Sequence, residues 1–142
     1  MRKSSEVNFV GTVLEAGEES KLAVFPEYCE ALNGIEAFSH VIVLYWLDKR
    51  DTPEERSVLK VTPKRHPGAP EVGVFASRSP TRPNPIAFEV CKLVGVDGCT
   101  LTVQDSDAFQ GTPIIDLKPY LPHADSVPDA RVPEWTRRGP KT

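Results

Sequence analysis

Short apolar segments alternate with polar turns along most of the chain. The most apolar segment, HVIVLYWL at 40–47, is rich in β-branched and aromatic residues, which favours a buried strand. Further strands are predicted at 7–14, 21–25, 59–62, 73–76, 87–96, 100–104 and 114–117. A helix is indicated only around 26–38, where Pro26 suits a first helical position and Gly34 can end the segment. The pattern predicts a mainly β fold, an antiparallel barrel or sandwich with one or two short helices.

Length and composition favour one globular domain. The chain has 142 residues, of which 39% are hydrophobic and 26% are charged. We expect a single domain over 1–142, with its core at about 7–121 and a proline-rich tail at 122–142. No apolar run is long enough for a membrane span, and the start of the chain carries no secretory signal. The three cysteines form no C-x-x-C pair, which predicts reduced thiols in a cytoplasmic protein.

Charge is distributed unevenly along the chain. The net charge of −3 gives no support to a nucleic-acid partner. Residues 60–92, however, include six Lys or Arg and only two Glu, which gives this segment a net charge of +4. Such a segment can attract anions, although an ordinary solvated face would explain the count equally well.

The segment SRSPTRPNPIAF at 77–88 combines three prolines with Arg78, Arg82 and Asn84. Proline fixes φ and removes a backbone donor, so the segment cannot lie in a central strand or a helix. A guanidinium held on a stiff loop can bind a carboxylate or a phosphate, or stack on a base. Either this is an anion-binding loop, or it is a proline-rich crossover that packs on the end of the β structure.

A second candidate segment is DSDAFQGTPIIDLKPYLP, at 105–122. Its Gly111-Thr112-Pro113 turn offers backbone donors and acceptors to a ligand, although such a turn is often only a turn. Asp116 and Lys118 can act in chemistry or form a surface ion pair. His40 can be a general base, a ligand or a structural residue, and the spacing of the three histidines argues against a zinc site.

Three stretches occur in the same order in the TsaA-like family, also called TrmO: IEAFSHVIVLYWL, VGVFASRSPTRPNPIAFEVCKL and GTPIIDLKPYLP. The chain resembles this family over roughly residues 7–125. The resemblance implies a small antiparallel β-barrel and a homodimer. It also implies S-adenosylmethionine bound without a Rossmann fold. The activity implied is N6-methylation of threonylcarbamoyladenosine at position 37, in the anticodon loop of tRNA.

The resemblance also implies roles for particular residues. Arg78 would face the methionine carboxylate of the cofactor, and the backbone of 108–112 would hold its adenine. The full set implied for the cofactor is Leu47, Asp48, Arg78, Ile86, Ala108, Phe109, Gln110, Gly111 and Thr112. The set implied for the substrate is Arg65, Arg82, Asn84 and Lys118, and the catalytic candidates are Asp116, as proton acceptor, and Tyr120. No metal is implied.

The chain differs from the family pattern at three places. Residues 15–20 replace a longer segment with a P-R-Q-x-G loop, Asp48 stands where a histidine is common, and Ala87 replaces the glycine of N-P-I-G. Two alternatives therefore remain at this stage. One is a methyltransferase with another small acceptor, and the other is a non-catalytic module that binds RNA or a nucleotide.

Overall fold

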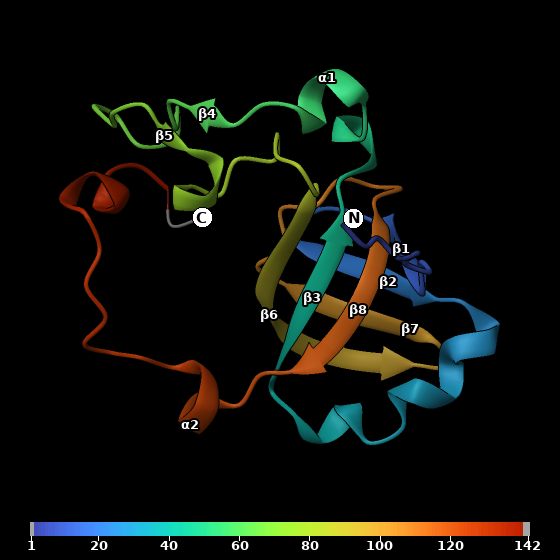
Figure 1. The fold of residues 1–142 in the computed structure, drawn as a ribbon. Helices are drawn as coiled ribbons and strands as arrows, with labels where there is room; N and C mark the ends of the chain where they lie inside the picture. Colours follow the sequence, from blue (N-terminus) through green and yellow to red (C-terminus); the bar gives the residue numbers. More distant parts are fainter. Residues whose placement is uncertain (1, 141–142) are drawn as a thin grey trace. The chain divides into compact units, whose positions relative to one another are not determined.

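The structure, a computed structural model, describes residues 2–140. It divides into two compact units: unit 1 comprises residues 2–46 and 88–121, and unit 2 comprises residues 47–87 and 122–140. Unit 1 contains a closed six-stranded barrel with the strand order β1-β2-β7-β6-β3-β8 (Figure 1). The predicted antiparallel barrel is confirmed. Its strands are β1 (Gly11–Glu15), β2 (Glu19–Val24), β3 (His40–Trp46), β6 (Ile86–Asp97), β7 (Thr100–Gln104) and β8 (Pro113–Pro119).

The core of the barrel follows from strict alternation along its strands. In β3, Val41, Val43 and Tyr45 are buried while the residues between them are only partly covered. Leu101 and Val103 alternate in the same way in β7. Because side chains in a strand point to opposite faces in turn, these apolar residues all lie inside the closed sheet. The full apolar lining also includes Val13, Leu22, Cys91 and Ile114.

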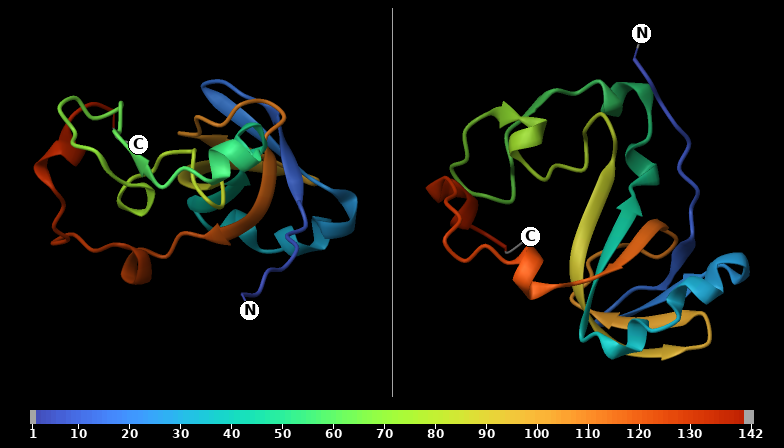
Figure 2. Two further views of the ribbon diagram at one scale, coloured as in Figure 1. Left: turned by 45° about the horizontal axis from the view of Figure 1, so that its top comes forward. Right: turned by 60° about the horizontal axis from the view of Figure 1, so that its bottom comes forward.

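Strands β3 and β6 are neighbours in the barrel although about 40 residues of chain separate them. The amide of Leu93 donates to Ser39 O (2.8 Å), and the amide of Leu47 donates to Pro85 O (2.7 Å). From the first pair to the second, the residue number increases along β3 and decreases along β6, so the two strands run antiparallel. Figures 1 and 2 both show them side by side. Most of unit 2 is therefore an insertion between the end of β3 and the start of β6.

The predicted helix at 26–38 consists of two 3₁₀ segments, η1 (Pro26–Leu32) and η2 (Ile35–Ala37). Gly34 between them has φ of +92°, a conformation that glycine adopts without steric cost. A two-residue turn, Gly98-Cys99, joins β6 to β7 as a hairpin.

The prediction of three reduced thiols is wrong for two of them. Cys29 in η1 and Cys99 in the β6–β7 turn form a disulfide, with their Cα atoms 5.3 Å apart. Val24, at the end of β2, donates its amide to Cys99 O (2.9 Å), which brings the turn beside the segment that starts η1. The sequence separation of 70 residues concealed this proximity. Cys91 is a free, buried thiol on the inner face of β6.

Unit 2 consists of loops, short 3₁₀ and α turns, and a two-stranded sheet. The segment 48–58 contains a helical turn that was not predicted from the sequence. Thr52 caps this turn by accepting a hydrogen bond from the amide of Glu55 (3.2 Å). The elements are η3 (Asp48–Arg50), α1 (Pro53–Arg56), β4 (Lys60–Val61), β5 (Val72–Gly73), η4 (Val74–Ala76), α2 (Pro122–Asp125) and η5 (Glu134–Arg137).

Within unit 2, the C-terminal η5 region packs on the loop between β4 and β5. Nδ1 of His66 lies 2.6 Å from Arg138 O, and the His66 ring meets Trp135 edge-on at 5.6 Å between centroids. The Arg138 guanidinium also donates to Pro67 O (3.1 Å). These contacts hold the part of the proline-rich C-terminal tail around Trp135 and Arg138 in place. The expectation of a single domain stays a prediction.

Over residues 2–140, no helix is both long and apolar enough to cross a membrane. In the same part of the chain, no three His, Cys, Asp or Glu side chains gather in a way that would hold a metal ion.

Candidate functional site

The arginine loop, which we define as residues 77–85 between η4 and β6, is held together by its own side chains. Arg82 donates to the carbonyl oxygens of Ser77 (3.1 Å) and Ser79 (3.0 Å). The serine hydroxyls accept hydrogen bonds from amides two residues later, Ser77 from Ser79 and Ser79 from Thr81, each at 3.2 Å. Arg82 was predicted to bind substrate, but its guanidinium donates hydrogen bonds to carbonyl oxygens of the arginine loop itself.

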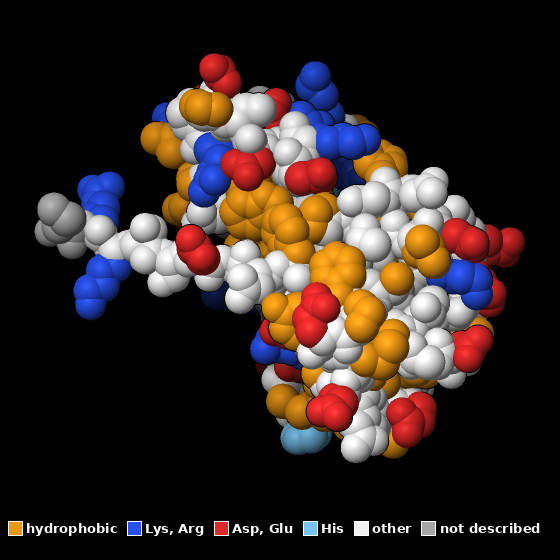
Figure 3. Space-filling view, turned by 90° about the vertical axis from the view of Figure 1, so that its right-hand side faces the viewer, with side chains coloured by type: hydrophobic (Ala, Val, Ile, Leu, Met, Phe, Trp, Pro, Cys, Tyr) orange, Lys and Arg blue, Asp and Glu red, His pale blue; other side chains and the backbone are white. Residues whose placement is uncertain are grey.

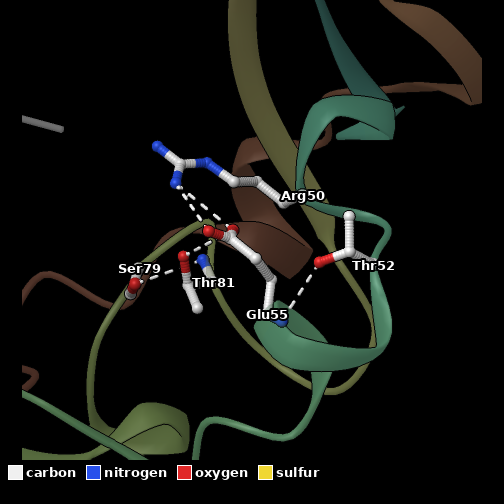
Figure 4. A network of polar contacts seen from close by, with 5 residues as sticks. All are labelled: Arg50, Thr52, Glu55, Ser79 and Thr81. Carbon is white, nitrogen blue, oxygen red and sulfur yellow. Dashed lines mark hydrogen bonds and ion pairs between the residues drawn. The ribbon is translucent and has the colours of Figure 1, made fainter.

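Helix α1 holds the arginine loop from outside. Glu55 accepts a hydrogen bond from the Thr81 hydroxyl (3.1 Å) and pairs with Arg50 (3.2 Å), as Figure 4 shows. Arg56 donates to Pro83 O (2.7 Å) and to Oδ1 of Asn84 (3.1 Å). The sequence analysis missed both α1 residues, although the T-P-E-E pattern at 52–55 is a recognisable helix start.

This bracing fixes the backbone that carries Arg78. The Arg78 side chain is exposed, and so is Phe75, which stands three residues earlier in η4 with 82% of its surface accessible. Arg65 is exposed in the loop between β4 and β5. Leu47 and Asp48 come at the junction with β3, where the Leu47 amide bonds to Pro85 O. Unit 2 thus presents exposed cationic and aromatic groups.

In unit 1, the segment 105–112 joins β7 to β8 and contains two residues with positive φ, Asp105 (72°) and Gly111 (88°). The Gly111 amide donates to Val13 O (2.8 Å), and the Thr112 amide donates to Phe109 O (3.1 Å). These two amides, proposed from sequence as ligand donors, serve the turn. The exposed ring of Phe109, with 70% of its surface accessible, offers a face on which an adenine can stack.

A polar network that the sequence analysis missed lies at one end of the barrel. The hydroxyl of Tyr45 lies 3.0 Å from Ser106 Oγ, and Ser106 donates to Oε1 of Glu89 (2.9 Å). The amide of Asp107 donates to Oε2 of the same carboxylate (2.9 Å). Because Ser106 gives its one proton to Glu89, Tyr45 must donate to Ser106. Tyr45 on β3 and Glu89 on β6 both occupy inward-facing positions. The alternation of inward and outward residues along each predicted strand was the signal that could have identified them.

The network changes the acidity of its members. Burial, together with a side-chain hydrogen bond to Asp107, raises the pKa of Glu89 to about 7. The hydrogen bonds from the Asp107 amide and the Ser106 hydroxyl act in the opposite direction. Burial also raises the pKa of Tyr45 and of Cys91, and the charge of Glu89 adds to both shifts. A strongly shifted carboxyl among hydroxyl and amide donors is typical of functional sites.

The two predicted catalytic residues lie elsewhere in unit 1. Asp116 is in the middle of β8, where its carboxylate accepts from the Leu117 amide (2.9 Å) and pairs with Lys118 (3.0 Å). Tyr120 follows β8, with its amide bonded to His40 O and its ring against the His40 ring. The 105–112 segment precedes β8. At about 3.3 Å per residue, Tyr120 is more than 20 Å along the strand from Thr112.

Asp116 also lines a cavity of about 400 Å³ on unit 1. The walls are mainly apolar and come from η1, η2 and β8, with Tyr28, Leu32, Phe38 and Leu117 among them. Exposed apolar side chains occur near the first strand as well, at Val7, Phe9 and Leu14. The face drawn in Figure 3 shows hydrophobic side chains near its middle and acidic side chains around them.

The residues predicted for the cofactor thus fall into two groups, one in each unit. Leu47, Asp48, Arg78 and Ile86 belong to unit 2, and residues 108–112 belong to unit 1. The chemistry of both groups fits S-adenosylmethionine. A guanidinium on a braced loop suits a carboxylate, and an exposed aromatic ring beside a tight turn suits a purine.

Comparison with known proteins places these features in a family. Residues 11–126 match the family model described as the tRNA-methyltransferase O N-terminal domain. A probable S-adenosyl-L-methionine-binding protein of Archaeoglobus fulgidus is 42% identical over 125 residues, which are 88% of this chain and 32% of that protein. The tRNA (adenine(37)-N6)-methyltransferase of Escherichia coli is 40% identical over 124 residues, covering 84% of this chain and 52% of the enzyme.

The fold agrees with the sequence comparison. The crystal structure of TrmO from Pseudomonas aeruginosa matches with a TM-score of 0.70 and 29% identity, over 91% of this chain and 61% of that one. The chain therefore spans about a third to two thirds of the length of these three proteins. Since the family model covers most of the chain and the barrel is shared, the chain belongs to the tRNA-methyltransferase O family.

Proposed function

We propose that the protein is a methyltransferase that uses S-adenosylmethionine to methylate N6 of threonylcarbamoyladenosine at position 37, in the tRNA anticodon loop. The observation that carries the proposal is the braced arginine loop, in which Arg82, Glu55 and Arg56 fix the backbone on both sides of the exposed Arg78. A guanidinium on a rigid loop binds a carboxylate with little loss of backbone entropy on binding. Family membership supports the same activity.

The cofactor residues of the proposal are those that the family resemblance implies. Arg78 binds the carboxylate of the methionine part, and the segment from Ala108 to Thr112 holds the adenine, with Phe109 stacking on it. Leu47, Asp48 and Ile86 complete the set. When bound, S-adenosylmethionine supplies an electrophilic methyl group. The chain aligns the acceptor nitrogen with that group and excludes water, and such alignment contributes roughly 7–11 kcal/mol in well-oriented reactions.

The substrate residues are basic or carry an amide. Arg65 is exposed on the loop between β4 and β5, and Asn84 is held in position by Arg56. Arg82 contributes through the loop that it braces, and Lys118 through its charge. Arginine side chains can contact phosphates and stack on unpaired bases, which is how proteins recognise RNA loops. The roles of Asp116 and Tyr120 in catalysis stay predictions.

We further propose that the protein is a homodimer and, because its proposed substrate is a tRNA, that it acts in the cytoplasm; the disulfide removes the earlier argument from reduced thiols. The outward face of β6 supports self-association: Phe88, Val90 and Val94 are 38–46% exposed where an isolated barrel would carry polar residues. Ile42 and Leu44 on the neighbouring β3 are half-buried and also point outward. A closed barrel has no free strand edge, so two copies would meet through these side chains with two-fold symmetry.

The decisive experiment supplies purified protein and S-adenosylmethionine with two tRNA preparations, with and without the threonylcarbamoyl group on the target adenosine. Mass spectrometry of the nucleosides measures the added methyl group. We expect one methyl group on the modified tRNA alone. Saturable binding of the cofactor with methylation of neither tRNA would indicate another acceptor. Absence of cofactor binding would instead indicate a binding module and would overturn the proposed activity.

A further inference from the structure

In unit 1, the carboxyl groups of Glu89 and Asp107 have no assigned role in the proposed methyl transfer. The Asp107 amide donates to Oε2 of Glu89 (2.9 Å), and the Asp107 carboxyl group raises the pKa of Glu89. Glu89 is half-buried while Asp107 is exposed, so a proton can reach the pair from outside the barrel. The pair is therefore positioned to exchange protons.

The pair adjoins the segment that is proposed for the adenine, because Asp107 directly precedes Ala108 in the chain. On β6, Glu89 occupies an inward-facing position. Fixed donors orient Glu89, with Ser106 on one carboxylate oxygen and the Asp107 amide on the other. Of the candidate acids in unit 1, Asp116 instead forms an exposed ion pair with Lys118.

We propose that Glu89, paired with Asp107, accepts the proton that leaves the acceptor nitrogen during methyl transfer. The inference rests on the proposed function. The lone pair of the nitrogen forms the new nitrogen–carbon bond, and the carbon–sulfur bond breaks with its electron pair staying on sulfur. The nitrogen proton passes to the Glu89 carboxylate. No oxidant, reductant or metal enters this balance.

The surroundings of Glu89 set the pH range in which it acts as a base. Among the described residues of unit 1, Asp107 is the titratable group that shifts the pKa of Glu89, and Glu89 in turn raises the pKa of Tyr45 on β3 and of Cys91 on β6. Asp105 lies within reach of Cys91. Burial and the Asp107 carboxyl favour the protonated form, which places the pKa near neutrality. Since the ionised form is the base, kcat should rise as the pH increases through about 7 and then level off.

The test compares the pH dependence of kcat for the wild type with that of Glu89→Gln. Glutamine keeps the size of the side chain and cannot accept a proton. We expect kcat to fall by about 100-fold or more and the rising limb near neutral pH to disappear. Calorimetry should give unchanged affinity for S-adenosylmethionine. The matched control is Glu19→Gln, a surface position on β2 that contacts Gln104, and it should leave the profile unchanged.

A second variant keeps the test informative if the first one folds poorly. Ser106→Ala removes a hydrogen bond that favours the ionised carboxylate, so the rising limb should move to higher pH. A purely structural role for the network would lower activity evenly at every pH. Equal pH profiles for the wild type and Glu89→Gln would overturn the inference alone. A wild type that methylates no tRNA would overturn the proposed function and this inference with it.

Discussion

Arg56 of α1 donates a hydrogen bond to Oδ1 of Asn84, at 3.1 Å, and so ties a helical turn to a loop that lies 28 residues further along the chain. Asn84 stands between two prolines, which limit its backbone, and Arg56 fixes its side chain. The amide of Asn84 is therefore aimed by its partner as well as by its neighbours. Bracing of this kind makes the arginine loop a platform for a ligand.

The first prediction concerns this bracing. Arg56→Ala removes the hydrogen bonds to Pro83 and Asn84 and should lower the free energy of unfolding by about 1–2 kcal/mol. Affinity for S-adenosylmethionine should fall as well, because Arg78 would lose its fixed backbone. Thermal unfolding and calorimetry measure the two effects. Arg131→Ala, in the exposed tail, is the control. Equal cofactor affinity in both variants would show that the bracing does not matter for binding.

Arg78 itself should be a principal contact of the cofactor. Arg78→Ala should weaken calorimetric binding of S-adenosylmethionine by about 1.5–3 kcal/mol, the contribution of a hydrogen bond to a charged group. Lysine at the same position should restore only part of the affinity, since it lacks the planar pair of donors. If Arg78→Ala bound S-adenosylmethionine with wild-type affinity, Arg78 would not be part of the cofactor site.

Binding of tRNA should depend on Arg65. In Arg65→Ala, we expect weaker binding and a salt dependence whose logarithmic slope is reduced by about 1, because one phosphate contact releases about one counterion. Titrations at several salt concentrations give the slope. Lys21→Ala, on barrel strand β2, should keep the wild-type slope. Should the two variants behave alike, the contact surface would have to lie elsewhere.

The disulfide should contribute strongly to stability. It closes a loop with a sequence separation of 70, for which the loss of unfolded-state entropy corresponds to about 4 kcal/mol. Denaturant unfolding with and without a reducing agent measures this contribution. The double variant Cys29→Ser, Cys99→Ser should resemble the reduced wild type and should not respond to the agent. A wild type that is equally stable under both conditions would contradict the prediction.

The outward face of β6 predicts how self-association can be broken. Light scattering should give twice the monomer mass of 15.7 kDa for the wild type. Val90→Glu should give the monomer mass, because it places a charge among Phe88 and Val94. Thr12→Glu, at a half-buried outward position of β1, is the control and should remain dimeric. A wild type that scatters as a monomer at micromolar concentration would end the dimer proposal.

The sequence predicted the barrel well because strand alternation and turn residues are local signals. The β3 segment was placed within one residue, and β7 was placed with its exact bounds. The disulfide and the Tyr45–Ser106–Glu89 network were missed because closure of the sheet creates them. The role of Arg56 was missed for a related reason, since its partners lie far along the chain. Local patterns indicated Arg78, but not what holds its loop.

Insertion of a unit between two adjacent antiparallel strands has an evolutionary consequence. The ends of such an insertion emerge about 5 Å apart, so a tight turn could replace it and still join β3 to β6. The entropic cost of closing a loop grows only slowly with its length. Lineages can therefore lengthen, shorten or replace the inserted segment without rebuilding the scaffold. In this chain the inserted segment contains the arginine loop, so a change in it would alter ligand contacts and leave the six barrel strands in place.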